Sequence, residues 1–379
     1  METITLYYAT NRKHESKNND SWHPESYGAS FSADGMENLR FGKVTINVDN
    51  AEVEKHLKDV DGGGLSSYFA NRAKSANIEA YEEKTDPNIL DSQQKDKLGS
   101  QAMFTDIKKE MEQSTDILVF IHGFNVSWHT AVGSAITLQS MLNRSGIGDK
   151  SQKVLVILFT WPSDGTALPY ASYKSDRSDA KGSGYAFGRS ILRLRDFLIN
   201  LNIEVKRGEA TFCKRNIHLL CHSMGNYVLQ NALGRIIEFI PVGGVLPKIF
   251  EHIFLCAPDV NDNVLENGQP MDRLHELCQS VNIYHNRQDV AMDISDYTKG
   301  NPERLGRGGA AHPSLLHNKI HQIECSPIVH SAIGHGYYLE GPVTEDIRLS
   351  MDDVAFDNPK RKRQRNGNLY NVWIMKACS

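Results

Sequence analysis

The sequence predicts an α/β fold in which a mostly parallel central sheet carries helices on both faces. Six short apolar runs lack the alternation of half-exposed strands, which is typical of strands buried on both faces of a parallel sheet; they cover residues 117–121, 154–159, 217–221, 252–256, 281–284 and 320–325. Segments with helical spacing separate them, at residues 130–142, 185–198, 226–239 and, less regularly, 271–279. This alternation predicts a doubly wound sheet with right-handed crossovers.

The N-terminal third is less regular, and we divide it into two predicted parts. Residues 1–50 contain two strand-like runs, ITLYYAT and FGKVTINV, which we expect to join the main sheet, with a polar loop over residues 12–39 between them. Residues 51–114 indicate a variable, partly mobile polar insertion with a helix near residues 103–112. Residues 115–379 form the predicted core, which ends with a strand in LYNVWIMK.

Composition and charge exclude several classes of partner. The 42 basic and 46 acidic residues give a net charge of −4, so neither nucleic acid nor an anionic membrane is the expected partner. The six cysteines form no CxxC pair, which favours a reducing compartment over a disulfide framework. The start METITLYYATNRKHE lacks the features of a signal peptide, and the longest apolar runs are too short to span a bilayer. We expect a cytoplasmic protein without stable membrane insertion.

Ligands of such sheets bind at the carboxyl ends of the strands, so the loops that follow the strands are the place to look for chemistry. The stretch NIHLLCHSMGNYVL carries an apolar run directly into Ser223 and then into a helical pattern. This arrangement is typical of a nucleophile elbow, in which a tight turn displays the hydroxyl and the N–H of Met224 faces a developing oxyanion. Cys221 stands where the motif has a small residue, and a plain structural corner remains the alternative.

A second strand end suggests the other half of an oxyanion hole. ILVFIHGFNVSW places His122 and Gly123 directly after a strand, and the backbone N–H of Phe124 would then point to the same site as that of Met224. A turn followed by a capped helix is the structural alternative. We expect His122 and Gly123 to border the substrate.

The chain also supplies a base and an acid in the order Ser, Asp, His that α/β-hydrolases use. Asp289 follows the predicted strand that usually donates the acid, and Asp259, after the preceding strand, is the alternative. His335, between two glycines after the last of the six runs, is the expected base, and His330 is the alternative. Position in the sheet order selects His335, because any one of 15 histidines is more often structural.

Other polar and aromatic residues give weaker signals. Trp161 and Tyr173 lie after another strand and would line the rim of the site, although a loop that packs its own aromatics is an equal alternative. His317 and His321 have helical spacing, but the glutamate of an HExxH motif is absent between them. We therefore expect no metal or other cofactor. The basic run PKRKRQR (359–365) is interpreted as a solvated loop, with a phosphate-bearing partner or a localisation signal as the alternative.

Taken together, several motifs resemble one family. YYATNR, LVFIHGFNVSW, FTWPSDG, HLLCHSMGNYVLQNAL, APDV, HNRQDVAM and GHGYY are similar to the motifs of a bacterial α/β-hydrolase family, the DUF900 group, over residues 1–11 and 115–350. The resemblance implies an α/β-hydrolase fold with Ser223 as nucleophile, His335 as base and Asp289 as acid. The family normally has alanine at the position of Cys221. The resemblance does not imply a substrate.

The expected function is that of a serine hydrolase that cleaves an ester or related acyl bond through an acyl-enzyme. The partner is then a small-molecule or lipid-like acyl substrate. Thioesterase, amidase and acyltransferase activities use the same site and are not separated from esterase activity by sequence. A catalytically weak or inactive binding protein on a hydrolase fold is the alternative from a different class.

Overall fold

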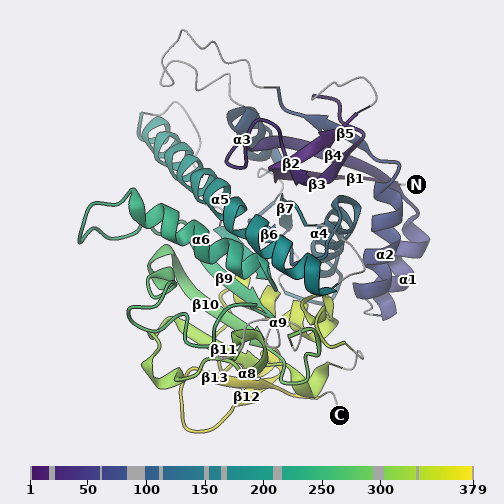
Figure 1. Ribbon diagram of the computed structural model, residues 1–379. Coiled ribbons are helices and arrows are strands. Elements are labelled where there is room, and N and C mark those ends of the chain that lie inside the picture. The colour runs from purple at the N-terminus through teal and green to yellow at the C-terminus, as the bar shows by residue number, and fades with distance from the viewer. Residues whose placement is uncertain are drawn as a thin grey trace.

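The computed structural model describes residues 2–16, 22–59, 62–82, 99–110, 114–148, 153–163, 169–207, 216–292, 303–329 and 333–377 (Figure 1). Its main sheet contains β1 (Glu2–Thr10), β4 (Arg40–Val48), β5 (Asn77–Ala80), β6 (Asp116–Ile121), β7 (Val154–Thr160), β8 (Asn216–His222), β9 (Phe250–Cys256), β10 (Cys278–His285), β11 (Ile320–Glu324), β12 (Arg363–Arg365) and β13 (Val372–Met375). The helices are α1 (Asn50–Asp59), α2 (Gly62–Ala73), α3 (Gly99–Glu110), α4 (Trp128–Leu142), α5 (Pro169–Lys206), α6 (Gly225–Glu238), α8 (Leu305–Gly308) and α9 (Gly341–Met351).

The strand order is β12-β13-β11-β10-β9-β8-β6-β7-β1-β4-β5 among the described residues. The strands from β13 to β1 in this order pair in parallel, and antiparallel strands flank them: β12 on β13, β4 on β1 and β5 on β4. The central strands are buried along almost their whole length, as in β6 and β8, because helices cover both of their faces. The predicted α/β sheet is confirmed.

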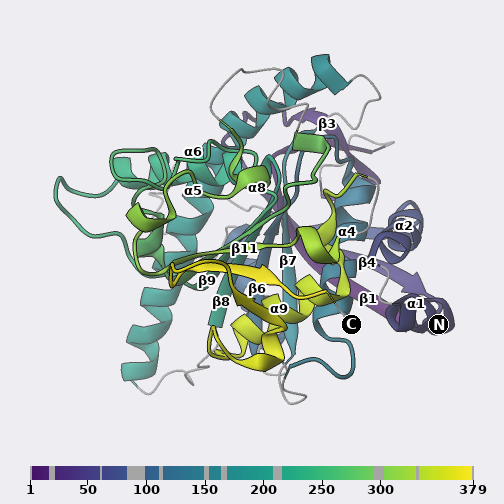
Figure 2. The same ribbon diagram turned by 90° about the horizontal axis from the view of Figure 1, so that it is seen from below.

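Alternate residues of each strand contribute to two separate cores. On one face, Leu219 of β8 packs with residues of α3, α5 and α6, and on the other, Leu220 packs with residues of α2, α4 and α9. Figure 2, which looks along the sheet, shows α5 and α6 on the side opposite to α4. Because β6, β8, β9 and β10 pair in parallel, their carboxyl ends share one edge of the sheet.

One prediction for the N-terminal third was wrong, and the helix expected near residues 103–112 corresponds to α3. The expected loop over residues 12–39 contains a hairpin of β2 (Arg12–Glu15) and β3 (Ser26–Phe31). The insertion also contains integral structure, because α2 buries Leu65 and Phe69 completely and packs closely on α4, while β5 extends the sheet. Residues 83–98 of the insertion lie outside the described residues. The sequence did not reveal these elements because few of their side chains are fully buried, so their apolar periodicity is weak.

The segment near residues 271–279 also differs from the prediction. Instead of a helix of several turns, it contains a short 3₁₀ turn at Leu274–Leu277, and β10 begins at Cys278. The burial of Leu274 and Leu277, three residues apart, suits one turn against the core and explains the helical spacing of the sequence.

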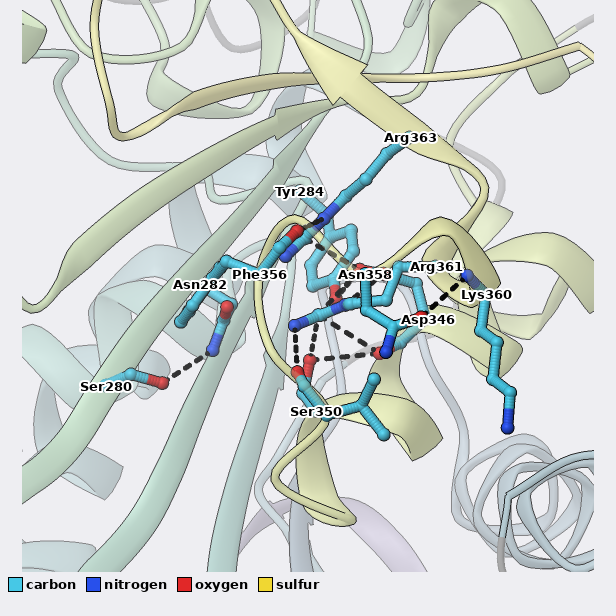
Figure 3. Close-up of polar contacts among 11 residues, drawn as sticks. Ser280, Asn282, Tyr284, Asp346, Ser350, Phe356, Asn358, Lys360, Arg361 and Arg363 are labelled. Carbon is cyan, nitrogen blue, oxygen red and sulfur yellow. Dashed lines mark hydrogen bonds and ion pairs between the residues drawn. The ribbon is translucent and has the colours of Figure 1, made fainter.

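The basic run near the C-terminus is not simply a solvated loop, so that prediction was wrong for two of its arginines. Arg361 and Arg363 are almost fully buried against Asp346 of α9, with contacts of 2.8 Å from Arg361 Nε to Oδ1 and 3.1 Å from Arg363 Nη1 to Oδ2 (Figure 3). Tyr284 donates a further hydrogen bond to Oδ2 at 2.7 Å. Burial alone would raise the pKa of Asp346, but the two arginines and this hydrogen bond lower it. The carboxylate therefore fastens the C-terminal hairpin to α9.

Replacing Asp346 by Ala is expected to lower the free energy of unfolding by about 3–5 kcal/mol, because two buried guanidinium groups lose their counter-ion. The matched control is Glu345→Ala on the same helix, which breaks the exposed ion pair with Lys362 and should change stability by less than about 1 kcal/mol. Urea unfolding followed by circular dichroism measures both. Equal losses for the two variants would contradict a structural role of the buried cluster.

Candidate active site

Ser223 occupies the corner between β8 and α6 in a strained backbone conformation. Its φ of 52° lies in the left-handed region, which a residue with a Cβ adopts only when its surroundings hold it there. The Ser223 amide donates to the carbonyl of Cys256 at 2.9 Å, and its carbonyl accepts from the amide of Asp259 at 3.2 Å and from the side chain of Asn226 at 3.0 Å. These bonds to β9, its following loop and α6 hold the turn that displays the hydroxyl.

Two glycines allow the loop after β6 to touch this corner. A Cβ at Gly123 would lie 2.8 Å from the Cβ of Ser223 and 3.3 Å from its Oγ. A Cβ at Gly225 would lie 2.7 Å from the carbonyl oxygens of Ile121 and His122. Contacts this short exclude any larger side chain without a shift of the backbone. The expected meeting of the two loops is therefore present.

The amides of Phe124 and Met224 both adjoin Ser223. Met224 follows it in the chain, and Phe124 follows Gly123, whose Cα faces the serine side chain. Within the described part of the chain, neither amide N–H donates to a protein acceptor. Two backbone donors beside one hydroxyl are thus available to a ligand.

His335 pairs with Asp289 and not with Asp259. Its Nδ1 lies 2.7 Å from Oδ2 of Asp289, whose side chain is fully buried, while 17% of the His335 side chain is exposed. The other carboxylate oxygen, Oδ1, accepts from the amide of Ala291 at 3.0 Å. His330 lies outside the described residues.

The loop that carries His335 has a defined path. Gly334 has a φ of 65°, and a Cβ there would lie 2.8 Å from the side-chain nitrogen of Asn286. That same nitrogen donates to the carbonyl of Gly334 at 2.8 Å. Asn286 follows β10 and precedes Asp289, so one short segment both supplies the acid and fixes the backbone next to the histidine.

His222, the residue before Ser223, joins the elbow to this loop. Its Nε2 lies 3.1 Å from the carbonyl oxygen of His335, and its ring lies 4.7 Å from the His335 ring and 4.4 Å from that of Tyr338. Burial, reinforced by His335, holds the pKa of His222 well below its usual value, so the neutral ring donates from Nε2. His335 therefore lies beside the elbow, although the structure contains no hydrogen bond between its imidazole and the Ser223 hydroxyl.

Asp259, the second acid at this edge, has other partners. Tyr173 donates its hydroxyl to Oδ2 of Asp259 at 2.8 Å, and Nε of Arg304 lies 3.5 Å from Oδ1. The ring of Tyr173 in turn packs edge-on against Phe124, with 5.6 Å between centroids. Asp259 and Tyr173 thus support the loop that presents the Phe124 amide.

His122 and Trp161 are packed inside the protein beneath this loop. The His122 imidazole contacts the carbonyl of Gly123 and the hydroxyl of Thr160, both at 2.8 Å. Trp161 stacks on the His122 ring and donates its indole N–H to the His122 carbonyl at 3.0 Å. Burial and the charge of Arg12 lower the pKa of His122 to about 3, so the ring is neutral.

Two charged residues hold the loop after β6: Arg12, to which the sequence assigned no role, and Asp176, which was expected at the rim of the site beside Tyr173. Arg12, almost completely buried, donates to the carbonyl of Val126 at 2.7 Å and to the hydroxyl of Thr160 at 2.9 Å. Asp176 accepts from the amide of Asn125 at 2.9 Å, and this asparagine has a φ of 58°. The only sequence signal for Arg12 was its place in the YYATNR motif, and no spacing indicated that it points inward.

The described residues contain no group of three or more histidine, cysteine, aspartate or glutamate side chains arranged to hold a metal ion. Over the same part of the chain, every helix is too short or too polar to cross a membrane. The arrangement around Ser223 is one of a hydroxyl, an imidazole and carboxylate pair, and backbone donors.

Two solved esterase structures and one protein family are similar to this chain. An esterase from Pyrobaculum calidifontis, in a monoclinic crystal form, superposes with a TM-score of 0.32 at 12% identity, over 64% of this chain and 78% of the other. A second structure, a hyperthermophilic esterase from the same archaeon, gives 0.29 at 12% identity, over 64% and 79%. No curated protein matches the chain. The family described as alpha/beta hydrolase of unknown function (DUF900) matches residues 98–350, more than half of the chain, and the protein therefore belongs to this family.

Proposed function

We propose that this protein is a serine hydrolase that cleaves an ester or related acyl bond, with Ser223 as nucleophile, His335 as base and Asp289 as the orienting acid. The observation that carries the proposal is the 2.7 Å contact between Nδ1 of His335 and the buried Asp289. His222, the residue before Ser223, contacts the carbonyl oxygen of His335 at 3.1 Å, so the pair lies beside the strained turn at Ser223. Membership of an alpha/beta hydrolase family supports the same chemistry.

The proposed steps use only these groups. Asp289 keeps the proton of His335 on Nδ1, which leaves Nε2 free to accept the proton of Ser223 as Oγ attacks the acyl carbon. The amides of Phe124 and Met224 donate to the resulting oxyanion, and each such donor is worth about 10²–10³ in rate. His335 then protonates the leaving group, and a water activated by the same imidazole hydrolyses the acyl-enzyme.

The missing Ser223–His335 hydrogen bond favours a second candidate, a binding protein on a hydrolase fold with an unused site. Catalytic hydrogen bonds are often long or misaligned before substrate binds and shorten in the complex. The absence of this hydrogen bond in the unliganded protein therefore counts little against the observed His335–Asp289 pair. The hydrolase is therefore the better-supported proposal.

A fluorophosphonate probe separates the two candidates. The purified protein is expected to become labelled on Ser223, and Ser223→Ala is expected to remain unlabelled while its circular dichroism spectrum is unchanged. Absence of labelling in the folded wild-type protein would favour the binding protein. p-Nitrophenyl esters of increasing acyl length would then identify the substrate range, since a small-molecule or lipid-like acyl compound is the proposed partner.

Replacing Asp176 by Ala is expected to lower kcat for ester hydrolysis by about 10²-fold, with little change in KM. The Asn125 amide loses its acceptor, and the neighbouring Phe124 amide then drifts from the position that an oxyanion requires. Asp196→Ala, at a position on the same helix where the side chain is largely exposed, is the matched control and should leave kcat unchanged. A rise in KM with an unchanged kcat would contradict a role of Asp176 in positioning the loop.

A further inference from the structure

A cavity of about 400 Å³ lies between the sheet and the helices α3 and α5. Its wall is mostly apolar, with Ile107 of α3, Ile191 of α5 and Val119 of β6 among the lining side chains. Helix α5 packs chiefly on α6, and its contact with α3 includes Phe197 against Phe104 at 5.1 Å between ring centroids. Figure 1 shows α5 extending across the sheet toward α3. The cavity occupies the space that these two helices leave over β6 and β7.

This cavity is separate from the candidate active site. Ile217, near the start of β8, and Phe250, at the start of β9, both line it. Ser223 follows the opposite end of β8, about 20 Å from Ile217 at roughly 3.3 Å per residue. The lining extends along β7 as far as Phe159, but it includes none of Ser223, His335 and Asp289. A ligand of the cavity therefore does not need to reach the nucleophile.

The charged residues of the lining are all cationic among the described residues. They are Lys108 of α3, Arg195 of α5 and Lys248 in the segment before β9. Arg195 pairs with the neighbouring Asp196 at 2.8 Å, and Lys248 pairs with Glu251 at 3.0 Å. Lys108 makes no ion pair with any residue that the structure describes. The cations are at least partly exposed, so they lie where the cavity meets solvent.

An apolar space of this size favours an occupant. Protein interiors are packed as densely as organic crystals, and apolar walls without contact atoms lose dispersion energy in proportion to the empty volume. Small-molecule sites have volumes of about 300–1,000 Å³ and combine an apolar wall with a few placed polar groups. From the apolar wall and the cationic opening we propose that this cavity binds a single-chain fatty acid, with its carboxylate at Lys108.

Isothermal titration calorimetry with dodecanoate below its micellar concentration tests the proposal. The wild-type protein is expected to bind one dodecanoate, and dodecyltrimethylammonium, which has the same chain and the opposite charge, is expected to bind at least tenfold more weakly. Lys108→Glu should weaken dodecanoate binding at least tenfold. Lys109→Glu is the matched control, since Lys109 points to Asp106 outside the cavity lining, and it should bind as the wild type does.

Ile191→Trp provides a second test because the larger side chain fills the apolar space. We expect loss of dodecanoate binding with a melting temperature equal to or above that of the unliganded wild type. Absence of dodecanoate binding to the folded wild-type protein would overturn the proposal, as would equal binding by Lys108→Glu and wild type.

Blocking Ser223 with the fluorophosphonate separates this site from the candidate active site. The labelled protein and Ser223→Ala are both expected to bind dodecanoate with unchanged affinity. If the label abolishes binding, the fatty acid occupies the active site and the inference fails while the hydrolase proposal stands. If the protein cannot be labelled but still binds dodecanoate in a manner that depends on Lys108, the hydrolase proposal fails and the inference stands.

Discussion

Replacing Asp289 by Asn is expected to lower kcat/KM for ester hydrolysis by about 10⁴-fold. Asn preserves the shape of the side chain, but its amide cannot fix the proton on Nδ1 of His335 as the buried carboxylate does at 2.7 Å. The imidazole then adopts the tautomer whose Nε2 carries a proton and cannot accept one from Ser223. The corresponding Asp-to-Asn change in serine proteases lowers kcat by about 10⁴-fold. Stopped assays of initial rate over a range of substrate concentrations measure the loss.

Asp259→Asn is the matched comparison at the same edge of the sheet. Because Asp259 contacts Tyr173 and Arg304, its loss should act through the position of the Phe124 loop. We expect a fall of about tenfold and an unchanged pH profile, whereas the residual activity of Asp289→Asn should rise with pH as hydroxide replaces the base. A greater loss at Asp259 than at Asp289 would show that the acid of the site has been assigned to the wrong residue.

The parallel core could be predicted from the sequence because its pattern has one dominant cause. A strand buried on both faces has to be apolar at nearly every position, so the run predicted at residues 117–121 lies within β6 and the run at 217–221 within β8. The motifs that follow these strands also indicated the family, and membership of the alpha/beta hydrolase family is confirmed. The assignment of catalytic roles to Ser223, His335 and Asp289 remains a prediction.

The supporting charges could not be predicted because their partners are distant in the sequence. Arg361 and Arg363 alternate with exposed lysines. Nothing in PKRKRQR indicates that Asp346 is the carboxylate with which these two arginines pair in the interior. Arg12 likewise contacts Val126 and Thr160, which lie more than a hundred residues away. Sequence patterns predict which residues of one helix or strand face the core. Whether a charged side chain is buried depends on the presence of an opposite charge, which a distant part of the chain supplies.

Mild acid is expected to unfold this protein because it buries several neutral histidines. Burial lowers the pKa of His122 and His252 to about 3 and that of His321 to about 4, with further lowering by nearby cationic groups such as Arg12 and Arg361. In the unfolded chain each ring has a pKa near 6.5, so below that pH only the unfolded state takes up these protons. Stability is then lost as the pH falls from about 6.5 toward 4, at about 1.4 kcal/mol per pH unit for each histidine.

Urea midpoints at pH 7.0 and 5.5 measure this loss, which should amount to several kcal/mol for the three rings together. His321→Phe is the informative variant, because its Nδ1 has no hydrogen-bond partner within the described structure and a phenyl ring preserves the stack on Phe356. Its stability should fall less steeply with pH than that of the wild type, by about 1.4 kcal/mol per pH unit. Equal midpoints at the two pH values would mean that the buried rings can take up protons in the folded state, and the packing around His321 and Arg363 would then have to open without unfolding the sheet.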